Sequence, residues 1–271
     1  MKLHRLAIPA TGFLLFSVFI PSRAQKTPDT TPAQVASNAA GTQPAPAMND
    51  EETARLLLAR KQYTEAEAIL HRLTVDQPKN AVYWNELGIS KHSQSQLGAA
   101  LKCYEKSAKL DAHYADPLNN AGTIWYERKQ YGKAIRAYRK AIKLRSDFAP
   151  FYLNLGYAFF NEKNYEDSIA NFRKALEIDP SAFDTTRSRT GTVVQDRSLS
   201  TDRGRFYFML AKSFAEAGNI ERCVIYLKKA RDEGFKEMNS VKTDPSFAAV
   251  LKDPGVQEAI EPKPATEMAQ P

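Results

Sequence analysis

The chain has 271 residues, of which 43% are hydrophobic and 25% charged, with 12 glycines and 15 prolines. These values are ordinary for a soluble globular protein and exclude collagen-like and wholly disordered classes. Removing the first 24 residues, which carry three cations (Lys2, Arg5 and Arg23) and no acid, reduces the formal net charge from +7 to +4. The other cations are spread among acidic residues, which indicates solvated helix surface and no nucleic-acid partner.

Residues 1–24 have the features of a secretory signal peptide. A charged start is followed by an apolar stretch from Leu6 to Ile20, and small residues, Ser22 and Ala24, precede the expected cleavage before Gln25. The alternative is a membrane anchor, but a bilayer-spanning helix needs about 20 apolar residues and this stretch has about 15. We therefore expect an exported protein, bacterial and either periplasmic or extracellular, with no stable membrane anchor after cleavage.

Two further segments are predicted to lack a fixed structure. Residues 25–48 are rich in Pro, Thr, Ala, Gln and Ser and contain no aromatic residue. Such a composition buries too little apolar surface to offset the entropy lost on ordering, so we expect a disordered linker. Residues 262–271 are predicted to form a disordered tail.

The middle of the chain repeats with a period of 34 residues. The segments 84–88, 118–122 and 152–156 each end in glycine, at Gly88, Gly122 and Gly156. The same step relates three aromatic residues, namely Tyr104, Tyr138 and Phe172. Within residues 131–141 the apolar positions are spaced 3, 4 and 3 apart, which lines one face of an α-helix. A fixed period of this length is typical of stacked helical hairpins.

These residues resemble the tetratricopeptide repeat family, in which repeat positions 8 and 20 are small. Position 8 is occupied by Ala54, Gly88, Gly122, Gly156 and Ala211. Position 20 is occupied by Ala66, Ala100, Ala134, Ser168 and Cys223. Lys91 departs from the pattern because it stands at position 11, which is normally apolar. The resemblance implies an all-α fold, a right-handed α-solenoid of helix-turn-helix repeats, with repeats 1–4 in residues 49–180 and repeat 5 in residues 204–237.

Two segments interrupt or follow the repeats. Residues 181–203 are rich in Ser, Thr, Arg and Asp and are predicted to be a polar loop insertion, with a small hairpin at residues 190–194 as the alternative. Residues 238–261 contain two Asp-Pro pairs, Asp244-Pro245 and Asp253-Pro254, each typical of a helix start. We expect capping helices here, because a solenoid needs its last apolar face covered.

The sequence predicts no catalytic residue, no metal site and no cofactor. It contains no phosphate-binding loop, nucleophile elbow or dinucleotide fingerprint. The four histidines form no pair at helical spacing, so paired metal ligands are absent. Cys103 and Cys223 lie in apolar helical patterns and are predicted to be buried free thiols.

The candidate binding surface is the concave groove, lined by the first helix of each repeat. In this family register, repeat positions 2, 5, 6, 9, 12 and 13 point toward the groove. The candidate groove residues are Asn85, Asn119, Asn120, Thr123, Tyr126, Asn154, Tyr157, Phe160, Arg205, Phe208 and Lys212. Aromatic rings beside amides make a plausible peptide-binding surface, because they give large contact area at a low cost in entropy.

The predicted function is a protein–protein interaction scaffold of the cell envelope that holds a partner segment, from a protein or peptide, in this groove. Asn120 and Asn154 share repeat position 6, and we expect them to bind the partner's backbone while contributing little to packing. Two alternatives stay open. These amides could instead bond to neighbouring helices, and the protein could be a structural envelope component acting by self-association or by contact with membrane or wall polymer.

Export gives the first testable prediction. Mass spectrometry of the protein recovered from the exported fraction is expected to show an N-terminus at Gln25, because the cleavage site follows Ala24. A protein that keeps Met1 and sediments with the membrane would instead support the anchor.

Overall fold

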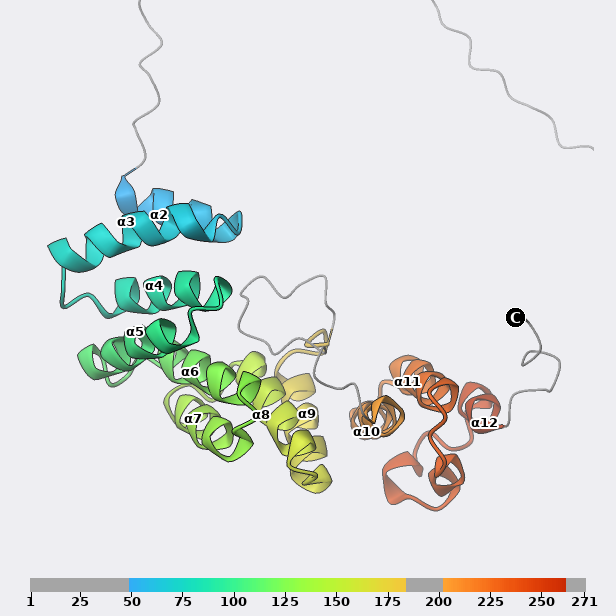
Figure 1. Cartoon of the computed structure of the whole chain (residues 1–271). Coiled ribbons are helices and arrows are strands. Elements are labelled where there is room, and N and C mark those ends of the chain that lie inside the picture. The colour runs from blue at the N-terminus through green and yellow to red at the C-terminus, as the bar shows by residue number, and fades with distance from the viewer. Residues whose placement is uncertain (1–48, 184–201, 262–271) are drawn as a thin grey trace, which may run out of the picture. The chain divides into compact units, whose positions relative to one another are not determined.

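A computed structural model describes residues 49–183 and 202–261 (Figure 1). Within them every regular element is helical. The α-helices are α2 (Asp50–Ala59), α3 (Tyr63–Asp76), α4 (Ala81–Ser93), α5 (Leu97–Leu110), α6 (Asp116–Glu127), α7 (Tyr131–Leu144), α8 (Ala149–Asn161), α9 (Tyr165–Ile178), α10 (Arg203–Glu216), α11 (Ile220–Asp232) and α12 (Pro254–Ile260). Two short 3-10 helices, η3 (Met238–Lys242) and η4 (Pro245–Phe247), precede α12.

The predicted signal peptide, linker, tail and most of the polar insertion lie outside the described residues. No helix among those described combines the length and apolar character needed to cross a bilayer.

The helices form antiparallel pairs that follow one another along the chain (Figure 1). Each first helix packs most extensively on the second helix of its own repeat, as α4 does on α5 and α6 on α7, and each second helix then packs on the next repeat. The fold is therefore an all-α solenoid of helix-turn-helix repeats, as the sequence predicts.

A turn with left-handed backbone joins the two helices of every repeat. Lys61, Ser95, Lys129 and Lys163 have φ values between +56° and +61°, and they stand 34 residues apart. The fifth repeat places Gly218 there, at φ +73°, a conformation that glycine adopts without a steric penalty. The turn recurs at repeat position 15 in all five repeats, which supports the register inferred from the glycines.

A glycine on the first helix and an aromatic ring on the second make the closest contact in repeats two to four. A Cβ atom on Gly88 would lie 2.5 Å from the Tyr104 ring, and one on Gly156 would lie 2.5 Å from Phe172. Gly122 has the same relation to Tyr138, at 2.6 Å. These separations are shorter than any van der Waals contact, so only glycine lets the two helices approach this closely.

Lys91, the departure from the apolar pattern, is explained by an ion pair. Its ammonium group contacts the carboxylate of Glu67 on α3, and the two side chains are 17% and 23% exposed. Gln94 and Gln96 donate to the other carboxylate oxygen of Glu67. Burial alone would raise the pKa of Glu67, but these donors outweigh it and lower the pKa.

Aromatic rings join repeat four to repeat five. Phe206 on α10 stacks on Tyr157 at 5.6 Å and meets the edge of Phe172 at 5.9 Å. Phe183, at the end of the described part of repeat four, contacts Phe172 at 5.4 Å and Phe214 at 5.6 Å. The fifth repeat thus continues the same core despite the insertion between α9 and α10.

The residues after α11 pack on the last repeat, with η4 against α10 and α12 against α11. The Asp244 and Asp253 side chains accept backbone hydrogen bonds at the starts of η4 and α12, and a proline follows each of them, as the two Asp-Pro pairs predict. Phe247 and Val256 are fully buried. The apolar edge of the last repeat is therefore covered by this C-terminal segment.

Both cysteines are buried free thiols. Burial raises the pKa of Cys103 and raises that of Cys223 to about 12. Neither thiolate forms readily near neutral pH, which favours a packing role for both residues.

The glycine–aromatic contact predicts opposite effects for two Gly→Ala substitutions. Gly156→Ala is expected to destabilise the protein by about 1–3 kcal/mol, because its Cβ overlaps the Phe172 ring. Gly98→Ala on α5 meets no atom within 4 Å and is expected to stabilise by up to about 1 kcal/mol through helix propensity. Urea unfolding measures both. Equal effects from the two substitutions would contradict the assigned helix contact.

Candidate partner-binding surface

The candidate groove residues lie on the first helices of repeats two to five, α4, α6, α8 and α10. The structure buries most of them: Asn85, Asn119, Asn120, Thr123, Tyr126, Asn154, Tyr157, Phe160 and Phe208. Arg205 and Lys212 remain partly exposed. The surface open to a partner is therefore narrower than the repeat register suggests.

Four buried asparagines form a hydrogen-bonded chain that links α4, α6 and α8. Asn154 donates to Asn119 at 2.8 Å, Asn119 donates to Asn120 at 3.3 Å, and Asn120 donates to Asn85 at 3.0 Å. Asn85 then donates to the hydroxyl of Tyr114 at 3.0 Å. We call these four residues the amide ladder.

The amide ladder corrects one expectation. Asn120 and Asn154 were expected to contribute little to packing, yet they are 4% and 0% exposed and hold neighbouring repeats together. Each of the two links between repeats joins position 5 of one repeat to position 6 of the next, a step of 35 residues. The interpretation in which these amides bond to neighbouring helices therefore describes what the structure shows.

A second row of polar contacts follows the same 35-residue step. The Asn161 amide donates to the Tyr126 hydroxyl at 2.7 Å, and His92 lies 2.9 Å from Glu127. Thr123 donates to the backbone carbonyl of Asn119. Polar side chains on the first helices thus mainly satisfy one another.

The two aromatic candidates on α8 pack between repeats. Tyr157 stacks on Phe206 and contacts Phe172, whereas Phe160 contacts Phe206 at 5.3 Å and Tyr165 at 5.7 Å. The alternative that such aromatics pack between neighbouring repeats therefore describes both residues.

The candidate face of α10 is covered by the chain itself. Phe208 stacks on Phe235 at 4.5 Å and contacts Phe247 at 5.6 Å. Lys212 forms an ion pair with Asp244 at 2.7 Å, with both side chains about one-fifth exposed. The C-terminal segment thus occupies the position that a partner segment would take on repeat five.

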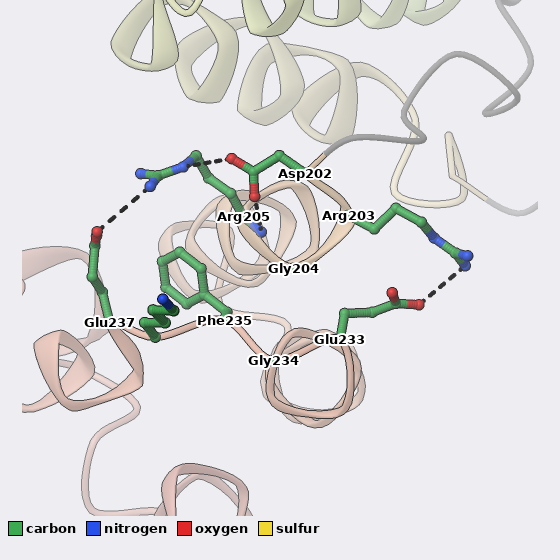
Figure 2. Close-up of a pocket in the computed structure, with 9 residues that line it drawn as sticks. Asp202, Arg203, Gly204, Arg205, Glu233, Gly234, Phe235 and Glu237 are labelled. Carbon is green, nitrogen blue, oxygen red and sulfur yellow. Dashed lines mark hydrogen bonds and ion pairs between the residues drawn. The ribbon is translucent and has the colours of Figure 1, made fainter.

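Arg205 lines a separate pocket of about 350 Å³ at the start of α10 (Figure 2). It pairs with Asp202 at 2.9 Å and with Glu237 at 3.5 Å, and Arg203 pairs with Glu233 at 3.2 Å across the pocket. Most of the charges around this pocket are therefore paired with one another, and Lys236 also lines it.

An acidic cluster at α2 and α4 was not among the candidates. Glu86 accepts from Arg55 at 3.2 Å, and Arg55 also pairs with Glu51 at 2.7 Å. Tyr83 donates to the second oxygen of Glu51 at 2.6 Å. Glu86 shares repeat position 6 with Asn120 and Asn154, so the sequence pattern could have identified it. Residues Glu51, Arg55, Tyr83 and Glu86 are called the acidic cluster below.

No group of three or more His, Cys, Asp or Glu side chains within residues 49–183 and 202–261 is arranged to hold a metal ion.

Two family models match the central repeats. The family described as TPR repeat matches residues 122–163, and the family described as tetratricopeptide repeat matches residues 149–182. The comparison with curated proteins gave no match.

Solved structures give distant matches. A structure of MamA from Desulfovibrio magneticus RS-1 is 16% identical, with 68% of this chain and 92% of that chain covered and a TM-score of 0.47. YrrB, described as a TPR protein with an unusual peptide-binding site, is also 16% identical, with 79% and 97% covered and a TM-score of 0.45.

The amide ladder predicts a stability effect. Asn154→Ala is expected to destabilise the protein by about 1–3 kcal/mol, because it leaves the buried Asn119 carbonyl oxygen without this donor. Asn239→Ala, at an exposed position on η3, is the control and should stay within about 0.5 kcal/mol of wild type. Urea unfolding measures both, and indistinguishable midpoints would contradict a structural role for the ladder.

Proposed function

We propose that this chain, whose central repeats match the tetratricopeptide repeat family, works as an exported scaffold that binds a segment of a partner protein beside α2 and α4. Its repeats supply a rigid stack of helices, and proteins of this architecture present extended binding surfaces. The signal-like N-terminal sequence supports export. The choice of this surface rests on a carboxylate oxygen of Glu86 that is buried without a hydrogen-bond partner among the described residues.

One carboxylate oxygen of Glu86 lacks a hydrogen bond. The side chain is 12% exposed, and Arg55 donates to Oε1. Oε2 is buried and has no hydrogen-bond partner among the described residues. Burial raises the pKa of Glu86, and the hydrogen bond from Arg55 opposes this shift only in part. A buried acceptor left unpaired destabilises the fold, which makes Glu86 a candidate for binding something else.

Two of the other position-6 residues show how Glu86 differs from the rest of the row. Asn120 and Asn154 are satisfied within the amide ladder. Glu86 cannot join it in the same way, because the residue at the corresponding preceding position is Glu51, a second carboxylate. Arg55 lies between the two acids and bonds to both.

The charge of the acidic cluster indicates the chemistry of the partner segment. With two carboxylates and one guanidinium ionised, the cluster carries a net charge of −1. Oε2 is buried in the free protein, so a backbone N–H or a lysine or arginine side chain of the partner could donate to it only after the side chains that cover it shift. Such a contact would reduce the excess charge. We therefore propose a partner segment that presents a basic side chain or a free backbone donor here.

Glu86→Gln tests the proposal on a partner. Full-length wild type, Glu86→Gln and Glu105→Gln are used as baits in the same envelope extract, and captured proteins are quantified by mass spectrometry. Glu105 is exposed on α5 and controls for the loss of one acid. The partner should be depleted only with Glu86→Gln, and its affinity should fall by about 1–3 kcal/mol, the usual worth of a hydrogen bond to a charged group. A partner retained equally by all three baits would contradict the assigned surface.

The same substitution predicts a pH-dependent change in stability. Because the folded pKa of Glu86 is raised, ionisation of its carboxylate opposes folding above that pKa, and protonation removes this effect as the pH falls through it. Glu86→Gln is therefore expected to raise the thermal midpoint at pH 7 and to lose this advantage in acid. A midpoint lowered at pH 7 would show that the ionised carboxylate stabilises the fold.

A further inference from the structure

Helix α7 carries five cations and no acid. They are Lys133, Arg136, Arg139, Lys140 and Lys143, and all five are exposed. None forms an ion pair within residues 49–183 and 202–261. Two have aromatic contacts instead, because Lys133 lies 4.5 Å from the Trp125 ring and Arg139 lies 5.2 Å from Phe159.

Four of these cations form one row along the helix. Residues 133, 136, 140 and 143 are spaced 3, 4 and 3 apart, so they share a face about 15 Å long. Ala134, Tyr138 and Ala141 occupy the opposite, buried face. The basic row therefore points away from the protein core.

This arrangement opposes helix stability. Like charges three or four residues apart repel each other by a few tenths of a kcal/mol per pair. Every other second helix among the described repeats contains acidic residues, and on α9 Arg173 and Lys174 both pair with Glu177. The unpaired row is thus a property of α7 and does not follow from the repeat architecture.

Apolar side chains border the row at both ends. Leu144, four residues after Lys140, is 39% exposed, and it is one of few large apolar side chains so exposed among the described residues. At the other end the half-buried Trp125 lies beneath Lys133 and Arg128. Cations flanked by leucine and tryptophan are typical of a surface that rests at a membrane interface.

We propose that the exposed face of α7 docks the protein on the anionic headgroups of a lipid membrane. Each lysine or arginine near such a surface contributes about 1 kcal/mol of attraction, and Leu144 adds a shallow apolar contact. Nucleic acid is a poorer fit, because α7 contains no Asn, Gln, Ser or Thr that could hydrogen-bond to bases or sugars. This contact is peripheral and uses a different surface from the acidic cluster.

Vesicle co-sedimentation of the full chain tests the proposal. Phosphatidylcholine vesicles are compared with vesicles in which about a third of the lipid is phosphatidylglycerol, an anionic lipid. The test variant is Lys133→Gln with Lys140→Gln and Lys143→Gln. The control is Lys79→Gln with Lys242→Gln and Lys252→Gln, three exposed lysines outside α7, so both variants have the same net charge and the same N-terminus.

Wild type and control should bind the anionic vesicles more strongly than the neutral ones, and added salt should reduce this preference. The α7 variant should lose at least about tenfold in partition to anionic vesicles, with an unchanged circular dichroism spectrum. Equal losses in both variants, or no preference for anionic lipid in wild type, would overturn the proposal.

Leu144→Gln separates a lipid surface from other polyanions. It should weaken binding to anionic vesicles several-fold while leaving retention on heparin unchanged, because only lipid offers an apolar region below its charges. Strong heparin binding with no vesicle binding would overturn the membrane assignment in favour of a soluble polyanion.

Discussion

The contact between a glycine and an aromatic ring inside each central repeat is the constraint on which the other features depend. The rings of Tyr104, Tyr138 and Phe172 each lie directly against the backbone of a glycine on the first helix. Any larger side chain at that glycine would push the ring away. Because the helices approach this closely, the first helices of successive repeats also come within reach of each other's polar side chains. The amide ladder can therefore form only if the helix pairs keep this spacing.

Whether a buried polar group has a hydrogen-bond partner within the protein then distinguishes structural positions from candidate binding positions. Asn119 and Asn154 are as fully buried as the apolar core residues, but they have amide partners on neighbouring helices. Glu86 continues the position-6 row into repeat two, where the preceding repeat offers a carboxylate and no amide. One change of residue type at the end of a regular row thus leaves a buried acceptor without a hydrogen-bond partner among the described residues.

The periodicity predicted much of the fold because each repeat imposes the same local packing. It could not predict how far the first helices bury one another, since that depends on contacts 35 residues apart and on the C-terminal segment that covers Phe208. The five cations of α7 can be read from the sequence, but the composition as a whole suggested that cations are evenly mixed with acidic residues. Only the structure shows that Lys140 and Lys143 form no ion pair within the described part of the chain.

Ionic strength should act unequally on the two proposed surfaces. The cations of α7 are exposed, and salt screens exposed charges over a Debye length of about 10 Å at 0.1 M, so docking on lipid should weaken steeply as salt rises. Glu86 is largely buried, and a hydrogen bond to its free oxygen is screened much less. A partner held at Glu86 should therefore stay bound at salt concentrations that release the protein from the membrane, which lets each contact be measured in the absence of the other.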